Sequence, residues 1–256
     1  MTTDEMEELL RSSVADFNEW RHENPDEVVD LGGADLSGMD LRGANLRNAQ
    51  LVSARMQGID AEGANFDGAS MESVDLSDAR LVHASLLGAH MMHATLVGAN
   101  LSGANLEGAA LHMADLRHSR LVGASLRGAV LSGASLNLAN VAHAQLDQAH
   151  LNHATLAHAN LWGSSLQFTH MHGIDLTHAN LTGATLVGSN LSDADLRGAD
   201  LDAARMGHVN LRSADVRGAS FVGASLQDAD FLDAQTEGAD FSRAGLEDAR
   251  FDPPDI

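Results

Sequence analysis

Histidine is the residue type in this chain with the widest range of chemistry, and it is concentrated in one part of the sequence. Twelve of the 14 histidines lie between residues 81 and 190. Imidazole ligates zinc-class ions and changes its charge near pH 6.5, so these residues could form a metal site or a pH-sensitive surface. The candidate metal ligands are His150, His153, His170 and His172. The sequence carries no metal-site spacing motif, and no carboxylate is expected beside them. The alternative is that outward positions simply tolerate histidine.

Catalytic chemistry finds no support in the sequence. The chain has no Cys, which excludes a thiolate nucleophile, a thiolate metal site and a disulfide scaffold. It contains no Gly-x-Ser-x-Gly elbow, no phosphate-binding glycine-rich loop and no His-Glu-x-x-His motif. We therefore predict neither catalytic residues nor a cofactor site, and we expect that the protein is not an enzyme.

The charged residues exclude two classes of partner. Acidic residues number 36 against 15 basic ones, all of them Arg, which gives a net charge of −21. Nucleic acids and anionic membranes require clustered cations, so direct binding to either is not expected. Acidic residues are sparse between residues 81 and 190, where four acids accompany three arginines, and dense toward both ends. We predict a partner-binding acidic surface formed by Asp175, Asp193, Asp195, Asp200, Asp202 and Asp215.

The elements that position these residues follow from a repeat of five. From Leu31 to Phe251 every fifth residue is apolar, with two departures at Ala61 and Thr236, and 35 of the 44 residues two positions before these centres are Ala. On an α-helix, at about 100° per residue, the central residues would form no stripe, and on a flat strand they would alternate between faces. Both difficulties vanish if the chain turns a corner in each unit. The repeat therefore predicts a β-solenoid whose central residue and preceding Ala point inward.

The repeated unit is Ala-(Asp/Asn/Ser)-Leu-x-Gly, as in residues 104–108, and it resembles the motif of the pentapeptide-repeat family over residues 31–251. The resemblance implies an all-β fold, a right-handed quadrilateral β-helix with four repeats in each coil and about 11 coils, stacked at about 4.8 Å. Residues 20 apart then lie above one another. His150 is expected to stack on His170, with His153 and His172 nearby.

The same stacking places like residues in columns along the rod. Three columns are the aspartates Asp175, Asp195 and Asp215, the arginines Arg117, Arg197 and Arg217 two residues along, and the asparagines Asn140, Asn160 and Asn180. Stacked carboxylates would repel one another, and we expect the arginines beside them to offset this repulsion. Stacked amides predict a ladder of side-chain hydrogen bonds.

Residues 1–30 lie outside the repeat and are predicted to form a helical cap on the solenoid. Apolar residues recur there at helical spacing, at Met6, Leu9, Leu10, Val14, Phe17 and Trp20. Thr2 with Glu5 makes a capping box, and Asn24-Pro25 should end the helix. A cap would cover the apolar side chains and unpaired backbone groups at the open end of a solenoid. The alternative is a separate partner-binding helix.

The other end of the array is predicted to be apolar. Phe241, Leu246 and Phe251 lie in the last coil, and residues 252–256 are expected to be a tail that stops the array. Such an end predicts a homodimer through the C-terminal coil, which the resemblance also implies. The alternative is that the Pro253-Pro254 tail suffices to close this end.

Three functions remain open. The first is a non-catalytic protein-interaction solenoid with an unknown partner. A cytoplasmic location is expected, since no apolar run approaches the roughly 20 residues of a membrane span and the acidic N-terminus is unlike a secretory signal. The second is implied by the resemblance: an acidic mimic of DNA that binds DNA gyrase or topoisomerase IV and protects it from quinolones or natural-product toxins. The third is metal binding by histidine.

Overall fold

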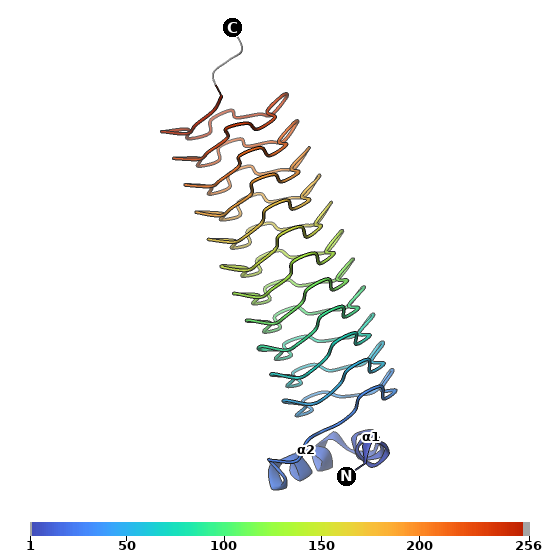
Figure 1. Ribbon diagram of the computed structural model, residues 1–256. Helices are drawn as coiled ribbons and strands as arrows, with labels where there is room; N and C mark the ends of the chain where they lie inside the picture. Colours follow the sequence, from blue (N-terminus) through green and yellow to red (C-terminus); the bar gives the residue numbers. More distant parts are fainter. Residues whose placement is uncertain (1, 253–256) are drawn as a thin grey trace.

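The computed structural model describes residues 2–252, which form a rod with two short helices at one end (Figure 1). The rod is built from parallel backbone bridges between residues 20 apart. The first joins Asp30 to Gln50 and the last joins Asp230 to Arg250, with one bridge at every fifth residue between them. Each turn of the chain thus comprises four repeats with one bridge in each, so the coil has four sides. The prediction that residues 20 apart lie above one another is confirmed.

The central residue and the residue two positions before it fill the inside of the coil. Every central residue from Leu31 to Phe231 is at most 1% exposed. Each coil is hydrogen-bonded to both neighbours: the N–H of Leu136 donates to the carbonyl of Thr155 at 2.7 Å, and the N–H of Ser135 donates to the carbonyl of Ala114 at 2.9 Å. Burying one Leu side chain is worth about 1.5–3 kcal/mol, so the stacked central residues are the main source of stability.

Each corner of the coil needs one residue in the left-handed backbone region, two positions after the central residue. Between residues 33 and 248 these corner residues have φ from 55° to 74°, and 21 of them are glycine whereas 23 are not. Asn, Asp and His are the other residue types enriched in this region. Eight of the 23 are His83, His93, His118, His143, His153, His158, His178 and His208. The backbone therefore gives a structural reason for more than half of the histidines.

The N-terminal segment forms two helices, α1 (Thr3–Ser12) and α2 (Val14–Glu23), where the apolar spacing predicted one. Ser13 separates them: its backbone is extended, with φ −164°, and its side chain accepts a hydrogen bond from the N–H of Asp16 and so caps α2. The predicted capping box of Thr2 and Glu5 is confirmed at the start of α1. Neither helix within residues 2–252 is long and apolar enough to cross a membrane.

The two helices contact the first coil through apolar and polar groups. Met6, Leu10 and Phe17 are buried in the same hydrophobic cluster as Leu31. The side chain of Asn18 donates to the carbonyl of Gly43 at 3.0 Å and accepts from the N–H of Asn45 at 2.8 Å. Farther along the rod, the equivalent N–H of Asn65 donates to Ala44 of the preceding coil at 2.9 Å. The side-chain oxygen of Asn18 therefore replaces the carbonyl of a preceding coil, which the first turn lacks.

The core opens toward solvent in the last coil. Phe231 is 1% exposed, whereas Leu246 and Phe251 are each 37% exposed. Aromatic rings stack along this end, with Phe221 and Phe241 4.9 Å apart and Phe231 and Phe251 4.7 Å apart between ring centroids. The predicted Pro253-Pro254 tail lies outside the described residues.

Candidate functional site

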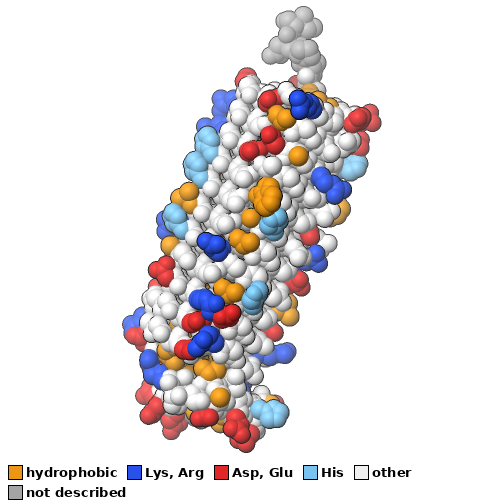
Figure 2. All heavy atoms as spheres, turned by 180° about the vertical axis from the view of Figure 1, so that it is seen from behind, with side chains coloured by type: hydrophobic (Ala, Val, Ile, Leu, Met, Phe, Trp, Pro, Cys, Tyr) orange, Lys and Arg blue, Asp and Glu red, His pale blue; other side chains and the backbone are white. Residues whose placement is uncertain are grey.

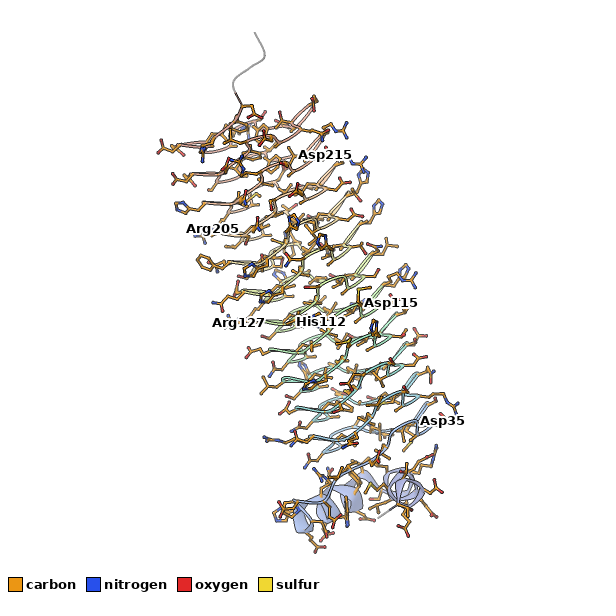
Figure 3. The ribbon with its side chains drawn as sticks, in the orientation of Figure 1. Asp35, His112, Asp115, Arg127, Arg205 and Asp215 are labelled. Atoms are coloured by element: carbon orange, nitrogen blue, oxygen red, sulfur yellow. The ribbon has the colours of Figure 1, made fainter. Side chains whose placement is uncertain are left out.

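One acidic column runs along an edge of the rod. Asp175, Asp195 and Asp215 are bridged in successive coils. Asp115 and Asp35 occupy the same column nearer the helices, and Figure 3 shows the labelled carboxylates of Asp35, Asp115 and Asp215 along this edge. The column is therefore the most extended acidic feature among the predicted site residues.

Arginine pairs with the carboxylates of this column. Arg197 donates to Asp195 at 2.9 Å through Nε and at 2.6 Å through a terminal nitrogen, and its Nε lies 3.6 Å from Asp215 Oδ2. Arg217 binds Asp215 in the same way. Hydrogen bonds from Arg197 and Arg217 lower the pKa of Asp195 and of Asp215, respectively, below the ordinary value. The expected offset of carboxylate repulsion by the arginine column is confirmed.

The asparagine column also behaves as predicted. The side-chain amide of Asn160 donates to Asn140 Oδ1 at 3.3 Å, and that of Asn180 donates to Asn160 Oδ1 at 3.3 Å. A second pair, Asn210 to Asn190, has the same geometry at 2.9 Å. These hydrogen bonds between side-chain amides stabilise the stacking of successive coils.

The remaining acidic candidates do not join the column of Asp195. Asp193 occupies a corner, with φ 57°. Asp200 is bridged to Asn180 and Ser220 on the neighbouring side of the coil. Asp202 lies one residue before the next corner residue, Ala203, and its carboxylate accepts hydrogen bonds from the Ser220 hydroxyl and, at 3.1 Å, from the N–H of Val222. The structure therefore spreads the predicted acidic surface over two sides of the coil.

The candidate histidines form pairs in successive coils. His150 and His170 stack with ring centroids 4.6 Å apart and an interplanar angle of 12°. His153 and His172 meet edge to face, 5.1 Å apart at 78°. A further stacked pair, His158 and His178, is 5.2 Å apart at 13°. The predicted stacking of His150 on His170 is confirmed. Within residues 2–252 no group of three or more His, Asp or Glu side chains is placed to hold a metal ion.

A carboxylate does lie beside one of these pairs, contrary to expectation. Asp193 Oδ2 is 3.2 Å from His172 Nδ1, and the hydroxyl oxygen of Ser192 is 3.1 Å from the same nitrogen. The sequence prediction missed this contact because Asp193 was assigned to the acidic surface. Its position one coil after Gly173, which follows His172 in the chain, is the signal that could have revealed it.

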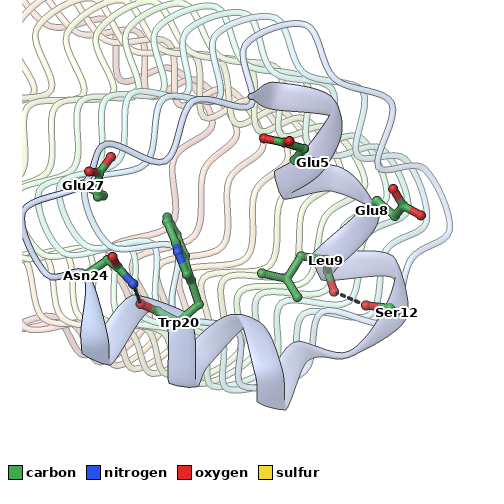
Figure 4. Close-up of a pocket in the computed structure, with 7 residues that line it drawn as sticks. All are labelled: Glu5, Glu8, Leu9, Ser12, Trp20, Asn24 and Glu27. Carbon is green, nitrogen blue, oxygen red and sulfur yellow. Dashed lines mark hydrogen bonds between the residues drawn. The ribbon is translucent and has the colours of Figure 1, made fainter. Parts of the chain in front are cut away.

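One hollow of the described chain lies on the helices (Figure 4). Its volume is about 660 Å³, and its lining residues are Glu5, Glu8, Leu9, Ser12, Trp20, Asn24 and Glu27. The hydroxyl of Ser12 donates to the carbonyl of Leu9 at 2.9 Å, and no histidine lines the hollow. The one hydroxyl among these lining residues is therefore bound to the backbone of its own helix. Sequence reasoning did not find this hollow, because it forms only where the chain breaks at Ser13.

Residues 81–190, the middle segment, expose large apolar side chains that the sequence prediction did not single out: Leu87, Met92, Met113, Leu138, Trp162 and Phe168. Met113, Leu138 and Phe168 occupy left-handed corners and are 59%, 53% and 57% exposed. On the face shown in Figure 2, acidic side chains gather over the helical end, while hydrophobic and histidine side chains are spread along the rod. A bulky residue two positions after a centre is the sequence signal that could have found Met113, Leu138 and Phe168.

A comparison with protein families finds the repeat along the whole rod. The model of the family described as pentapeptide repeats matches eight copies within residues 30–252. A comparison with curated proteins gives no match.

Three solved structures are similar to the chain to different extents. The first is HetL, a pentapeptide repeat protein involved in heterocyst differentiation regulation from the cyanobacterium Nostoc sp. strain PCC 7120. It is 27% identical, with 93% of this chain and 97% of that chain covered and a TM-score of 0.43. Rfr23, a pentapeptide repeat protein from the cyanobacterium Cyanothece 51142, is 30% identical over 38% of this chain and 60% of that chain, with a TM-score of 0.27. Full-length QnrB1, a plasmid-mediated fluoroquinolone resistance protein, is 17% identical over 88% and 93%, with a TM-score of 0.22.

Proposed function

The chain belongs to the pentapeptide-repeat family, and from this premise we propose that it is a non-catalytic scaffold whose middle segment is surrounded by a protein partner. The observation that carries the proposal is the exposure of Met113, Leu138 and Phe168 at left-handed corners. A non-glycine residue in this conformation costs roughly 1–2 kcal/mol, and exposing a large apolar side chain recovers none of that cost. Glycine, asparagine or aspartate would serve the corner better, so these side chains fit a role in binding.

The middle segment suits an apolar protein surface. Its four acidic residues and three arginines give it a net charge of −1, while the whole chain carries −21. A partner would therefore meet little electrostatic repulsion there and could bury the exposed apolar groups. The edge contact between His143 and Trp162, with ring centroids 4.5 Å apart, adds a half-exposed aromatic group at the fourth corner of the coil, so the exposed apolar groups surround the rod.

The test replaces the three apolar corner residues by asparagine, which also suits the left-handed region. The Met113→Asn, Leu138→Asn, Phe168→Asn variant and the wild type are cross-linked in an extract of the source cells. We expect the specifically captured protein to be lost with the variant. A matched control changes Ser53, Ser73 and Ser213 to Asn at corners of the same geometry, and it should retain the partner. Equal capture by all three proteins would contradict the proposal.

A second candidate, mimicry of DNA toward DNA gyrase or topoisomerase IV, is favoured by the acidity of the chain. B-DNA carries one negative charge per about 1.7 Å of its axis. The middle segment spans about 26 Å at the usual strand spacing, a length over which B-DNA would carry about 15 charges. The net charge of −1 there cannot imitate DNA. Residues 191–256 hold 14 acids and six arginines, so this hypothesis is restricted to the C-terminal part of the rod.

This alternative is tested by gyrase supercoiling and cleavage assays with and without a quinolone. The informative variant carries Asp193→Asn, Asp200→Asn and Asp228→Asn. Asp193 and Asp228 have histidines as their ion-pair partners, so their charge is less compensated than that of Asp195. If mimicry holds, the wild type inhibits supercoiling or relieves the drug, the effect weakens with salt, and the variant loses it. No effect of the wild type on either enzyme would eliminate this candidate.

We also propose a homodimer through the C-terminal coil. Leu246 and Phe251 are partly exposed, and Phe241 packs edge to face against Phe251 at 5.7 Å between ring centroids. A second copy placed end to end would cover these groups and the unpaired backbone of the last coil. Analytical ultracentrifugation should give about twice the chain mass of 26.9 kDa, and Phe251→Arg should give the monomer. A wild-type monomer at high concentration would rule out this assembly.

A further inference from the structure

The orientation of the imidazole rings separates one histidine pair from the others. An ion bound through a ring nitrogen lies in the plane of that ring. The rings of His150 and His170 are nearly parallel and stacked, so their planes have no common point near the rings. The planes of His153 and His172 cross at 78° and share a line, on which one ion can lie in both planes. Of these two pairs, only the crossed one has ring planes that intersect near the rings, and a turn of one ring out of its edge-to-face contact would point a nitrogen of each ring at a single ion.

The spacing of this pair also fits a shared ion. With metal–nitrogen distances of about 2.0–2.1 Å, each ring centroid lies about 3.2 Å from the ion, so two ligands in tetrahedral geometry have centroids about 5.2 Å apart. The centroids of His153 and His172 are 5.1 Å apart. The pair spans two successive coils, in which the N–H of His153 donates to the carbonyl of His172 at 2.9 Å. The backbone therefore fixes the separation of the two residues.

Asp193 fixes the orientation of His172. Its Oδ2 lies 3.2 Å from His172 Nδ1, so it can accept the Nδ1 proton and leave the lone pair of Nε2 free for an ion. Metal-bound histidines usually donate their other ring N–H to a carboxylate, a carbonyl or a water in this way. Ser192 Oγ, 3.1 Å from the same nitrogen, lies on the same side of the ring. Both contacts are made through Nδ1, so Nε2 is the nitrogen that would bind an ion.

Gly173 makes room for the ring of His153. A Cβ atom at residue 173 would lie 2.6 Å from His153 Nδ1 and 2.9 Å from its Cε1, which is closer than real Cβ contacts. The ring of His153 therefore rests on the one residue type that leaves this space, directly after His172 in the chain. This gives a way to displace the ring without removing a ligand.

We propose that His153 and His172 bind a single zinc-class divalent cation, with Asp193 as a positioning residue for His172. Imidazole ligands favour Zn²⁺, Ni²⁺ and Cu²⁺ over Mg²⁺ and Ca²⁺, which prefer oxygen. Water completes the coordination, since both side chains are on the outside of the coil. The site lies in the middle segment, apart from the acidic column of Asp195.

The experiment is isothermal titration of the untagged full-length protein with zinc chloride at pH 7.5. We expect the tightest site to bind one ion per chain. His153→Asn keeps a residue that suits the left-handed corner, and this variant and His172→Gln should each weaken that site at least tenfold. Asp193→Gly should weaken it by about tenfold, the lower end of the effect of removing such an outer carboxylate. Magnesium chloride should show no binding.

Two matched pairs of variants keep the test independent of folding. His158→Asn removes a ring of a stacked pair from a corner with the same φ of 58°, and it should leave zinc affinity unchanged within twofold. Gly173→Ala should weaken zinc binding by displacing His153. Gly183→Ala has a similar φ and an open Cβ position, and it should not weaken binding. Absence of zinc binding by the wild type, an equal effect of His158→Asn and His153→Asn, or unchanged affinity in Gly173→Ala would overturn the proposal.

Discussion

The middle segment (residues 81–190) and the C-terminal segment (residues 191–252) share one backbone and carry different chemistry. In both, bridges join residues 20 apart and the central residues point inward. The middle segment has 12 histidines and only four acidic residues, whereas the C-terminal segment has one histidine and pairs Asp with Arg in stacked columns. All of the buried hydroxyl side chains, Ser119, Ser164, Thr169 and Ser189, lie in the middle segment.

This difference shows that separate positions of the repeat specify the fold and the surface. The central residue and the residue two before it determine the coil. The outward residues are constrained only by the left-handed corner and by the equivalent residue of the neighbouring coil. The same rod can therefore present a nearly neutral, partly apolar surface in one segment and an acidic one in the next. Substitutions at matched inward and outward positions test this separation.

The largest expected effect comes from introducing a charge inside the middle segment. Leu136→Asp would bury an unpaired carboxylate and should lower the stability by several kcal/mol. Leu138→Asp makes the same change two residues later, at a corner with φ 62° and 53% exposure, where Asp is well suited. Its effect should stay within about 0.5 kcal/mol. Thermal unfolding followed by circular dichroism compares the two. Equal shifts in Tm would show that the inward register is wrong.

A smaller effect is expected where a side chain of one coil covers a glycine of the next. Gly188 and Gly218 have φ of 67° and 66°, so replacing either by Ala carries the same backbone cost of roughly 1–2 kcal/mol. At Gly188, in the middle segment, a new Cβ would lie 2.7 Å from the ring of Phe168, whereas nothing lies within 4 Å at Gly218 in the C-terminal segment.

Gly188→Ala should therefore lower Tm more than Gly218→Ala. Because the ring of Phe168 is exposed and can turn away, the difference in destabilisation between the two variants should remain below about 1 kcal/mol. In a Phe168→Ala background the two glycine substitutions should become equivalent. A difference that persists in that background would locate the cause in the backbone instead of the covering ring.

The smallest expected effect is the loss, in acid, of the stability that the Asp–Arg pairs contribute. Hydrogen bonds from Arg55 and Arg42 lower the pKa of Asp35 and of Asp40 from 3.8 to about 2. Since the folded carboxylate binds its proton more weakly than the unfolded one, the stabilisation is present above pH 3.8. It is lost as the pH falls from there toward 2.

The same direction applies to Asp195 and Asp215 in the C-terminal segment and, in the middle segment, to Asp115. Carboxyl carbon chemical shifts followed by NMR between pH 5 and 1.5 would measure these titrations. Arg217→Gln should move the pKa of Asp215 back toward its ordinary value and flatten the stability profile in this range. A profile unchanged by that substitution would mean that the exposed pairs contribute nothing measurable.

The coil could be predicted from the sequence because its signal is carried by inward residues. Apolar centres, most of them Leu, and the Ala two residues before them recur without an insertion, and this fixes which side chains are buried. Which residues stack followed from the four repeats per coil that the family resemblance implies. The break at Ser13 could not be predicted in this way. The apolar spacing from Met6 to Trp20 continues across the break. The second helix begins there with a hydrogen bond from the N–H of Asp16 to the Ser13 side chain.

The candidate sites were predictable in position but not in orientation. The stacking of successive coils places His153 near His172, yet the angle between their rings depends on side-chain rotamers that no repeat specifies. The contact of Asp193 with His172 also depends on side-chain rotamers. Eight histidines occupy equivalent positions because those positions are left-handed corners. The repeat motif describes only the inward residues, so it does not predict histidine at the corners.

The uninterrupted period also governs how such a chain can change length. Deleting four consecutive repeats, for example residues 121–140, would remove one full turn and leave every later residue above the same column as before. Deleting a single repeat would keep Leu and Ala inside but rotate everything beyond the junction by a quarter turn relative to what precedes it. A gene encoding this rod can therefore lengthen, shorten or re-aim its surfaces in steps of one repeat, and only a step that is not a whole number of repeats would disturb the core.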